Sequence, residues 1–332
     1  MLHYYIQRFL FMILILLVVS VVGFIIIQLP PGDFLNSYIA TLEMTGTKVD
    51  QSQRAALTKQ YGLDLPIYLQ YFKWMGNMFQ GDLGMSFSYN KPVSELIGER
   101  IVLTVSISLF TLILTYIVAI PIGIYSATHQ YSFGDYFFTL IGFVGVATPN
   151  FLMALILAFF LNKFFGLHVG GLFSSEYVHA PWSPGKVLDM INHLWVPVIT
   201  IGAAGLAFLI RIMRGCLLDE LQKQYVITAR AKGLSEGTLL FKYPVRIALN
   251  PIVSVLGWAF PLIVSGEIIT AITLNLPTTG PLFLQALLSQ DMYLAGSIMM
   301  LLSALTVVGV FVSDLLLVWL DLRIRFEKIS GG

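Results

Sequence analysis

Charged side chains are scarce in this sequence of 332 residues, where Asp, Glu, Lys and Arg together make up 11%. Hydrophobic residues account for 57%, and the mean hydropathy is +0.82. This balance excludes a soluble domain and is typical of a polytopic membrane protein. The net charge of +1 and the lack of a long Lys/Arg run give no sign of nucleic-acid binding.

Cysteine is nearly absent, since Cys216 is the only one, and this excludes an intrachain disulfide and a cysteine-based metal cluster. The five histidines lack metal-ligand spacing such as His-Glu-x-x-His, so we expect no fixed metal site. Near Pro184-Gly185-Lys186, Ala180 stands where a phosphate-binding loop needs its first glycine, and Val187 follows the lysine. We therefore expect this chain to bind no ATP by that device, and no cofactor of its own.

Six apolar runs are long enough to cross a bilayer, which takes about 20 residues. They cover residues 9–29, 101–128, 136–165, 193–213, 251–274 and 294–320. The first run is too long for a signal-peptide core and lacks an Ala-x-Ala type cleavage site, so we expect it to be retained. Prolines inside the runs are candidates for kinks, either static or hinge-like: Pro121, Pro149, Pro197 and Pro261.

The runs suggest a division into three parts. Residues 1–29 form an N-terminal segment with the first span, residues 30–100 a large external loop, and residues 101–332 a core of five helices with a loop at 214–250. Basic residues gather in the loops and ends on the side of the N-terminus, whereas the short loops on the other side hold only Lys163 and Lys186. This bias predicts that both termini and the 214–250 loop are cytoplasmic.

The stretch from Tyr225 to Pro251 is the basic part of that loop. Each of its charges would cost roughly 2.5 to 3.5 kcal/mol at the centre of a bilayer, so we expect the stretch to lie in water. Gly233 suits the left-handed end of a first short helix, and Ser235 suits the N-cap of a second. Asn250 and Pro251 then predict the N-cap and first residue of the next span.

Small residues in the first of these helices, Ala229 and Ala231, would let it approach another surface closely. We interpret the loop as a docking element. Two basic residues just before it, Arg211 and Arg214, stand at the inner end of the fourth run, where snorkelling to lipid phosphates is expected.

The loop resembles that of the permease subunits of ABC importers, in the branch that carries oligopeptides, dipeptides, nickel and related solutes. That family has a Thr-Ala-Arg-Ala-Lys-Gly-Leu core, matched from Thr228 to Leu234, and an Arg-x-Ala-Leu-x-Pro segment, matched from Arg246 to Pro251. Similar strings recur along nearly the whole chain, including Ala147-Thr148-Pro149-Asn150-Phe151. The resemblance implies that a set of loop residues plugs into a groove on an ATPase subunit: Thr228, Ala229, Arg230, Ala231, Lys232, Gly233, Leu234, Ser235 and Glu236.

The resemblance also implies an all-α membrane protein with six transmembrane helices in the type I ABC importer permease fold. The expected partners are a second homologous permease, two ABC ATPase subunits that hold ATP and Mg, an extracytoplasmic substrate-binding protein and membrane lipid, with no nucleic acid. The expected place is a bacterial or archaeal plasma membrane, and the expected cargo is oligopeptides or dipeptides, with nickel, glutathione or oligosaccharides as alternatives. Such a chain is no enzyme itself and works by alternating access.

Glu267 and Asp314 are ionisable residues inside apolar runs, where such residues usually face a bundle interior or a water cavity. The family often has a Glu where Ala271 stands here, and Glu267 lies four residues earlier on the same helix face. We take Glu267, Pro149, Asn150 and Asp314 as candidates for the translocation path or a gate. For Glu267, packing through a hydrogen bond to a neighbouring helix is the alternative.

Two other classes of protein compete with the importer. A proton-coupled secondary transporter would use Glu267 and Asp314, but it requires no docking loop of this form and usually shows an inverted repeat, which is not evident here. An intramembrane enzyme would need paired catalytic groups at membrane depth, and the sequence offers none.

Overall fold

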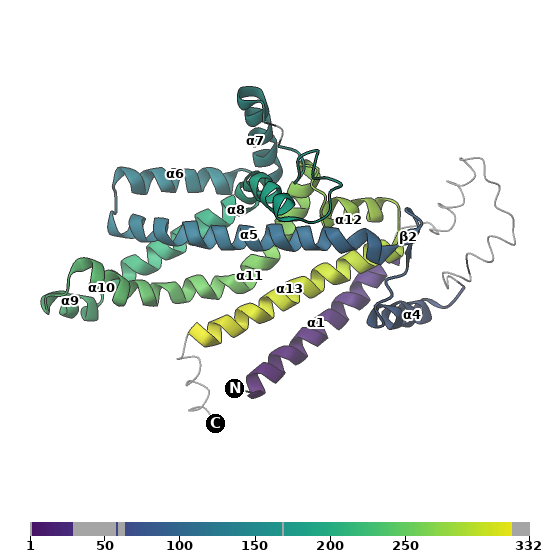
Figure 1. Cartoon of the computed structure of the whole chain (residues 1–332). Helices are drawn as coiled ribbons and strands as arrows, with labels where there is room; N and C mark the ends of the chain where they lie inside the picture. The colour runs from purple at the N-terminus through teal and green to yellow at the C-terminus, as the bar shows by residue number, and fades with distance from the viewer. Residues whose placement is uncertain (1, 29–57, 59–63, 168, 321–332) are drawn as a thin grey trace. The chain divides into compact units, whose positions relative to one another are not determined.

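In a computed structural model, the structure describes residues 2–28, 58, 64–167 and 169–320. Helices make up most of this part of the chain (Figure 1). Five of them are long and apolar enough to cross a membrane, or six spans exist if one bent pair counts as one. The described elements are α1 (Leu2–Gln28), α4 (Ile67–Phe79), β1 (Met85–Ser86), β2 (Lys91–Pro92), α5 (Val93–Thr128), α6 (Phe133–Ala147), α7 (Asn150–Phe165), α8 (Pro184–Leu221), α9 (Gln224–Ala231), α10 (Glu236–Lys242), α11 (Pro244–Thr273), α12 (Thr279–Leu288) and α13 (Met292–Leu320).

The chain divides into two compact units. The larger comprises Met1–Tyr5, Thr104–Pro277 and Val308–Gly332, and the smaller comprises Ile6–Leu103 and Thr278–Val307. Both α5 and α13 therefore contribute to each unit. The predicted division at residues 29 and 100 follows the apolar runs of the sequence, whereas the two units follow the packing of the structure. The predicted division therefore stays a prediction.

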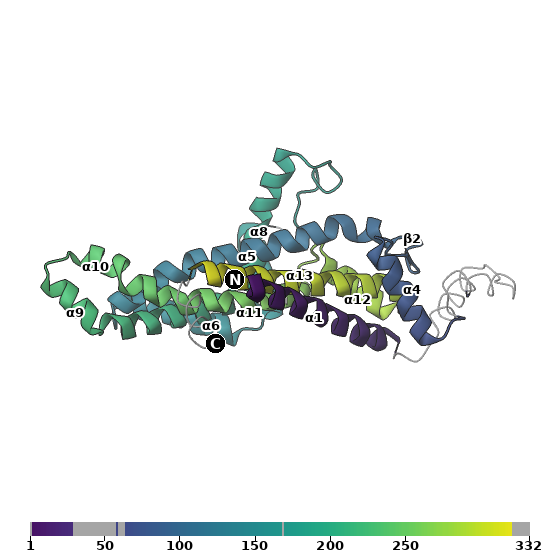
Figure 2. The same cartoon turned by 90° about the horizontal axis from the view of Figure 1, so that it is seen from below.

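The larger unit is organised around α8, which packs against α11, α6 and α7. Leu209, Met213 and Leu217 of α8 form a buried core with Val245, Ala248 and Ile252 of α11. Figures 1 and 2 both show α9 and α10 at one end of this helix pair. The docking loop is thus carried at the end of a packed pair of long helices.

Small residues let α6 lie close to α8. A β-carbon on Gly145 would lie 3.1 Å from the carbonyl oxygen of Ala203, and one on Gly142 would lie 3.3 Å from the β-carbon of Ala207. Such pairing of small residues is how membrane helices approach closely.

The single helix expected over residues 136–165 is instead two helices, α6 and α7. The helix direction bends by 111° between them. Pro149 explains the break, because proline lacks the N–H that would continue the helix and disfavours a helical residue before it. Thr148 accordingly has an extended backbone, with φ −97° and ψ 118°. Pro149 is therefore confirmed as a bend, whereas α5, α8 and α11 continue through Pro121, Pro197 and Pro261.

One predicted helix start is wrong. Asn250 and Pro251 lie inside α11, which begins at Pro244 with Tyr243 as its N-cap residue. Pro244 provides the favoured proline at a first helical position seven residues earlier, so the helix needs no second start. The fourth predicted apolar run, residues 193–213, lies inside α8, which begins at Pro184 with the Ser183 hydroxyl accepting a hydrogen bond from the Lys186 N–H at 3.2 Å.

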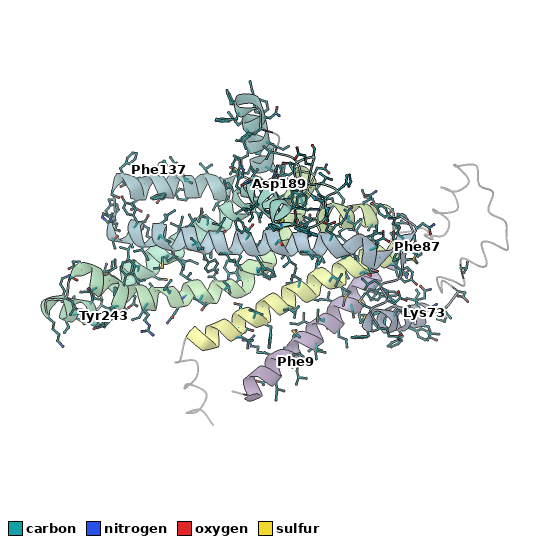
Figure 3. The ribbon with its side chains drawn as sticks, viewed as in Figure 1. Phe9, Lys73, Phe87, Phe137, Asp189 and Tyr243 are labelled. Atoms are coloured by element: carbon teal, nitrogen blue, oxygen red, sulfur yellow. The ribbon has the colours of Figure 1, made fainter. Side chains whose placement is uncertain are left out.

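The segment between α7 and α8 is fixed by a carboxylate. Asp189 accepts hydrogen bonds from the N–H of Ser174 at 2.8 Å and from its hydroxyl at 2.6 Å (Figure 3). The buried Lys186 ammonium lies 4.8 Å from the ring centroid of Phe173 and 5.1 Å from that of Trp182. This connection is therefore an ordered structure of its own.

The smaller unit joins a β-hairpin to the start of α13. Asp291 is fully buried, and its carboxylate accepts hydrogen bonds from the Ser86 hydroxyl at 2.6 Å and the Ser88 N–H at 3.0 Å. Before the hairpin the chain turns at Gly81 and Gly84, whose φ values are +80° and +79°. Residues 30–57 and 59–63 of the predicted external loop lie outside the described residues.

Within the same unit, α1 packs against α4 through aromatic rings. The Phe24 ring centroid lies 5.5 Å from that of Tyr71 and 5.7 Å from that of Trp74. The Ser20 and Tyr71 hydroxyls are 2.7 Å apart and hydrogen-bonded. Other apolar side chains of α1, such as Phe9, are exposed (Figure 3).

Candidate docking loop and candidate pathway residues

The two short helices predicted in the loop are confirmed as α9 and α10. Gly233 has a φ of +80°, the left-handed conformation that the prediction required. Its N–H donates to the carbonyl of Arg230 at 3.0 Å, and the N–H of Leu234 donates to the carbonyl of Ala229 at 3.5 Å. This pair of bonds is a Schellman motif, which satisfies the last carbonyls of α9 and turns the chain into α10.

An apolar cluster joins the two helices. Val226, Ala229 and Leu239 are buried in it, with Leu234 and Tyr243 packed around them. Ala229 packs within this cluster and is 8% exposed, so its small side chain accommodates α10, and its expected part in docking stays a prediction. Ala231, by contrast, is exposed and remains free for a close approach.

An ion pair closes the hairpin on the outside. Arg230 donates from Nε to Oε1 of Glu236 at 2.6 Å and from Nη2 to Oε2 at 3.0 Å, so the pairing is bidentate. Both side chains are at least half exposed, which limits the contribution of this pair to stability. The pair fixes the orientation of two of the nine predicted docking residues.

The outer surface of the loop combines cations with apolar side chains. Ile227 and Phe241 are 48% and 63% exposed, although the loop has an internal core that could have held them. The exposed cations beside them are Lys223, Lys232, Lys242 and Arg246. A rigid, basic and partly apolar surface of this kind suits protein binding.

Tyr225 ties α9 back to α8. Its hydroxyl donates a hydrogen bond to the Glu220 carboxylate, and its ring lies 6.5 Å from that of Tyr243 (Figure 3). Burial, with the neighbouring Glu220 charge, raises the pKa of Tyr225 above its ordinary range. The phenol therefore remains a hydrogen-bond donor at physiological pH.

The break between α6 and α7 brings Asn150 to α11. A β-carbon on Gly266 would lie 3.0 Å from Nδ2 of Asn150, so these two residues are in close contact. Glu267 is the next residue and is fully buried, as is Ala271 one turn later. The predicted shared face of Glu267 and Ala271 is confirmed, and the structure brings Pro149, Asn150 and the neighbourhood of Glu267 together.

Asp314 is not part of this group. Its neighbour Ser313 lies against Gly257, where a β-carbon would be 3.5 Å from the serine hydroxyl. Gly257 precedes Glu267 by ten residues, which is about 15 Å along a helix. Glu267 lies in α11, and Asp314 lies in α13 next to the level of Gly257. The two carboxylates considered for proton transport are therefore at different heights along α11.

A half-open cavity of about 500 Å³ lies beside Asn150. Its walls are mostly apolar, and Asn150, Tyr116 and Arg211 supply the larger polar groups. Among the residues that the structure describes, no group of three or more His, Cys, Asp or Glu side chains is placed to hold a metal ion.

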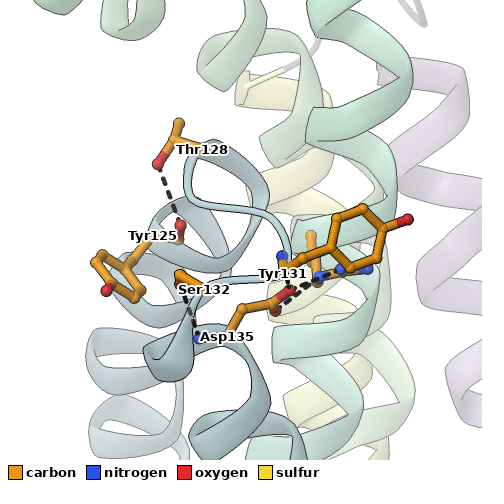
Figure 4. A network of polar contacts seen from close by, with 6 residues as sticks. Tyr125, Thr128, Tyr131, Ser132 and Asp135 are labelled. Carbon is orange, nitrogen blue, oxygen red and sulfur yellow. Dashed lines mark hydrogen bonds and ion pairs between the residues drawn. The ribbon is translucent and has the colours of Figure 1, made fainter.

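One polar cluster, formed by Asp135 and Arg214, was not predicted from the sequence. Arg214 of α8 donates to the two carboxylate oxygens of Asp135 at 3.0 and 2.9 Å, and Asp135 also accepts from the N–H of Tyr131 at 3.0 Å (Figure 4). Ser132 caps α6 by accepting from the Asp135 N–H at 3.2 Å (Figure 4). The Ser-x-x-Asp spacing signalled the cap, but the partner is 79 residues away in sequence.

Comparisons with known proteins cover almost the whole chain. Residues 119–326 match the family described as "Binding-protein-dependent transport system inner membrane component", and residues 1–108 match "Binding-prot-dependent transport system membrane comp, N-term". The chain is 36% identical to the oligopeptide transport system permease protein AppB of Bacillus subtilis, over 97% of this chain and 99% of that protein. It is 32% identical to a putative peptide permease protein of Brucella ovis, over 98% and 99% of the two chains. The chain thus belongs to the family of binding-protein-dependent transport system inner membrane components.

Proposed function

We propose that the chain is the transmembrane permease subunit of an ATP-driven importer of oligopeptides or dipeptides. The names of the relatives, which are peptide permeases matched over nearly their full length, carry this proposal. The rigid basic loop of α9 and α10 supports it, because a permease without its own nucleotide site needs a surface on which an ATPase can act.

In the proposed topology the chain crosses a bacterial plasma membrane six times, with α6 and α7 as one broken span. Both termini and the α9–α10 loop face the cytoplasm, and residues 30–100 are external. The bias of basic residues supports this orientation.

The proposed complex contains a second homologous permease, two ABC ATPase subunits with ATP and Mg, and an extracytoplasmic binding protein. One docking loop per chain matches one ATPase per permease. Closure of the ATPases would move the loop residues 228–236 and, through α8 and α11, rock the bundle between two access states. Glu267, Pro149 and Asn150 would line the path or its gate, and Asp314 is the weaker candidate because it lies apart from them.

The test is uptake of a labelled oligopeptide by proteoliposomes that contain the complex purified through this chain. We expect uptake to require internal ATP and the binding protein, and to continue when a protonophore removes the proton gradient. Uptake driven by an imposed pH gradient without ATP would overturn the proposal and favour a proton carrier. In that case Glu267→Gln would abolish uptake, whereas in the importer it should leave ATP dependence intact.

A further inference from the structure

A small cavity of about 200 Å³ lies between α6 and α8. Arg211 and Arg214 of α8 and Thr139 of α6 supply its polar groups, and Phe138, Phe143 and Ile210 supply apolar walls. Residues three apart on a helix are neighbours on one face, so the two guanidinium groups approach the cavity together. The site thus pairs concentrated positive charge with aromatic surface.

The Arg214 guanidinium is held in a fixed orientation. Its Nε and Nη2 donate to Asp135, whose side chain is 4% exposed, while the arginine side chain is 27% exposed. These two bonds leave Nη1 available as a donor. A planar guanidinium fixed along one edge presents its remaining N–H groups in a defined direction.

Arg211 supplies the net charge. It is exposed, its guanidinium carbon lies 6.0 Å from the ring centroid of Phe143, and within the part of the chain that the structure describes it makes no ion pair. Asp135 neutralises only one of the two arginines. The site therefore carries one uncompensated positive charge, which complements an anion.

The surroundings of the site are apolar. Outward-facing side chains of α6, including Phe137, Leu140 and Val144, are 48%, 63% and 52% exposed (Figure 3). On the other side of α6 lies a cavity of about 530 Å³ with almost entirely apolar walls, and it shares Phe138, Gly142, Ala207 and Ile210 with the small cavity. A ligand bound here would contact the arginines at one point and apolar side chains on both sides of α6.

We propose that Arg211 and Arg214 form a binding site for the phosphate of an anionic phospholipid whose acyl chains lie along α6. The charge requires an anion, and the apolar walls favour one attached to hydrocarbon over a free anion. Arg211 also stands where the apolar part of α8 ends, which is the depth of a phosphate in the cytoplasmic leaflet under the proposed orientation. Basic pockets between membrane helices on that side recognise lipid headgroups in this way.

The experiment compares phosphatidylglycerol with neutral phosphatidylcholine in native mass spectrometry and in melting of the purified complex in detergent. We expect the wild type to retain phosphatidylglycerol preferentially and to melt at a higher temperature with it. Arg211→Gln should weaken this binding about fivefold, as expected for one cation at a lipid phosphate, and Arg211→Lys should restore part of it. Lys163→Gln, which removes an exposed cation at the end of α7 outside the cavity, is the matched control.

Equal retention of the two lipids by the wild type would overturn the proposal. So would an equal loss of binding in Arg211→Gln and Lys163→Gln, which would indicate unspecific attraction to the membrane. Competition by soluble glycerol phosphate at comparable concentration would contradict the lipid and indicate a free-anion site. Melting of the variants without added lipid separates a folding defect from a binding defect, and peptide uptake is not involved in any of these outcomes.

Discussion

Gly233 combines a backbone requirement with a place at the centre of the proposed docking surface. Its φ of +80° is a conformation in which a β-carbon meets the adjacent carbonyl. No side chain lies within 4 Å of the position, so a substitution acts through the backbone alone. The residue therefore allows a test of loop geometry that changes no contact.

We expect Gly233→Ala to destabilise the α9–α10 turn by about 1 kcal/mol, because alanine is strained in the left-handed region. Recovery of the ATPase subunits with the purified chain should fall accordingly. Gly237→Ala is the control, since Gly237 lies inside α10 with open space around it, and alanine is favoured there. Equal recovery with both variants would show that the turn does not control ATPase binding.

Asp135 is the second residue whose loss we expect to be costly. It is 3% exposed and accepts charge-assisted hydrogen bonds from Arg214. Asp135→Asn should lower the stability of the chain in detergent by roughly 1.5 to 3 kcal/mol, the usual contribution of hydrogen bonds to charged groups. Glu95→Gln removes an ion pair to Lys91 whose side chains are more than half exposed, and should cost about 0.5 kcal/mol or less. The melting temperatures of the two variants test these expectations, because Asp135→Asn should melt at a clearly lower temperature than Glu95→Gln.

Among the helices, α6 and α8 form a close pair in the larger unit. The positions of the five long apolar helices followed from the sequence, because long apolar runs have few alternatives in a bilayer, whereas the run over residues 136–165 is divided into α6 and α7. The start of α11 did not follow from the sequence, because Pro244 and Pro251 both suit a first helical position. The Asp135–Arg214 pair depends on packing between residues distant in sequence, which hydropathy does not report.

Because α6 and α8 approach closely, we expect the stability of the chain to be sensitive to a larger residue at Gly145. A β-carbon there would be 3.1 Å from the backbone oxygen of Ala203, so α6 must move outward to accept it. We expect Gly145→Ala to lower stability by about 1 to 3 kcal/mol, as overpacking does. Gly215→Ala on α8, where no atom lies within 4 Å, should be neutral or slightly stabilising. Thermal melts that do not distinguish them would mean that the helices separate easily.

For the molecule as a whole, the sequence predicted the transport family from the loop motif, and the candidate path residues stay a prediction. Asn150 and the neighbourhood of Glu267 came together because Pro149 breaks the span, which the motif did not indicate. Asp314 was grouped with Glu267 only because both interrupt apolar runs. Charge in a hydrophobic run indicates an unusual environment, but it does not say which helix faces which.

The orientation of the whole chain can be tested with one cysteine at a time. In a Cys216→Ala background, Gly237→Cys in α10 and Glu176→Cys between α7 and α8 place single thiols at exposed positions. We expect a membrane-impermeant maleimide to label Gly237→Cys only in inverted vesicles and Glu176→Cys only in right-side-out cells. Labelling of both from the same side would contradict the proposed topology.

The length of α8 has a mechanical consequence. Its 38 residues form one helix of about 57 Å, roughly twice the thickness of the hydrocarbon core. Because the helix continues through Pro197 without a break, a tilt of about 5° imposed at the docking loop would displace its far end by about 5 Å. The helix can thus transmit motion along its whole length, and the displacement on the far side is set by its length and rigidity.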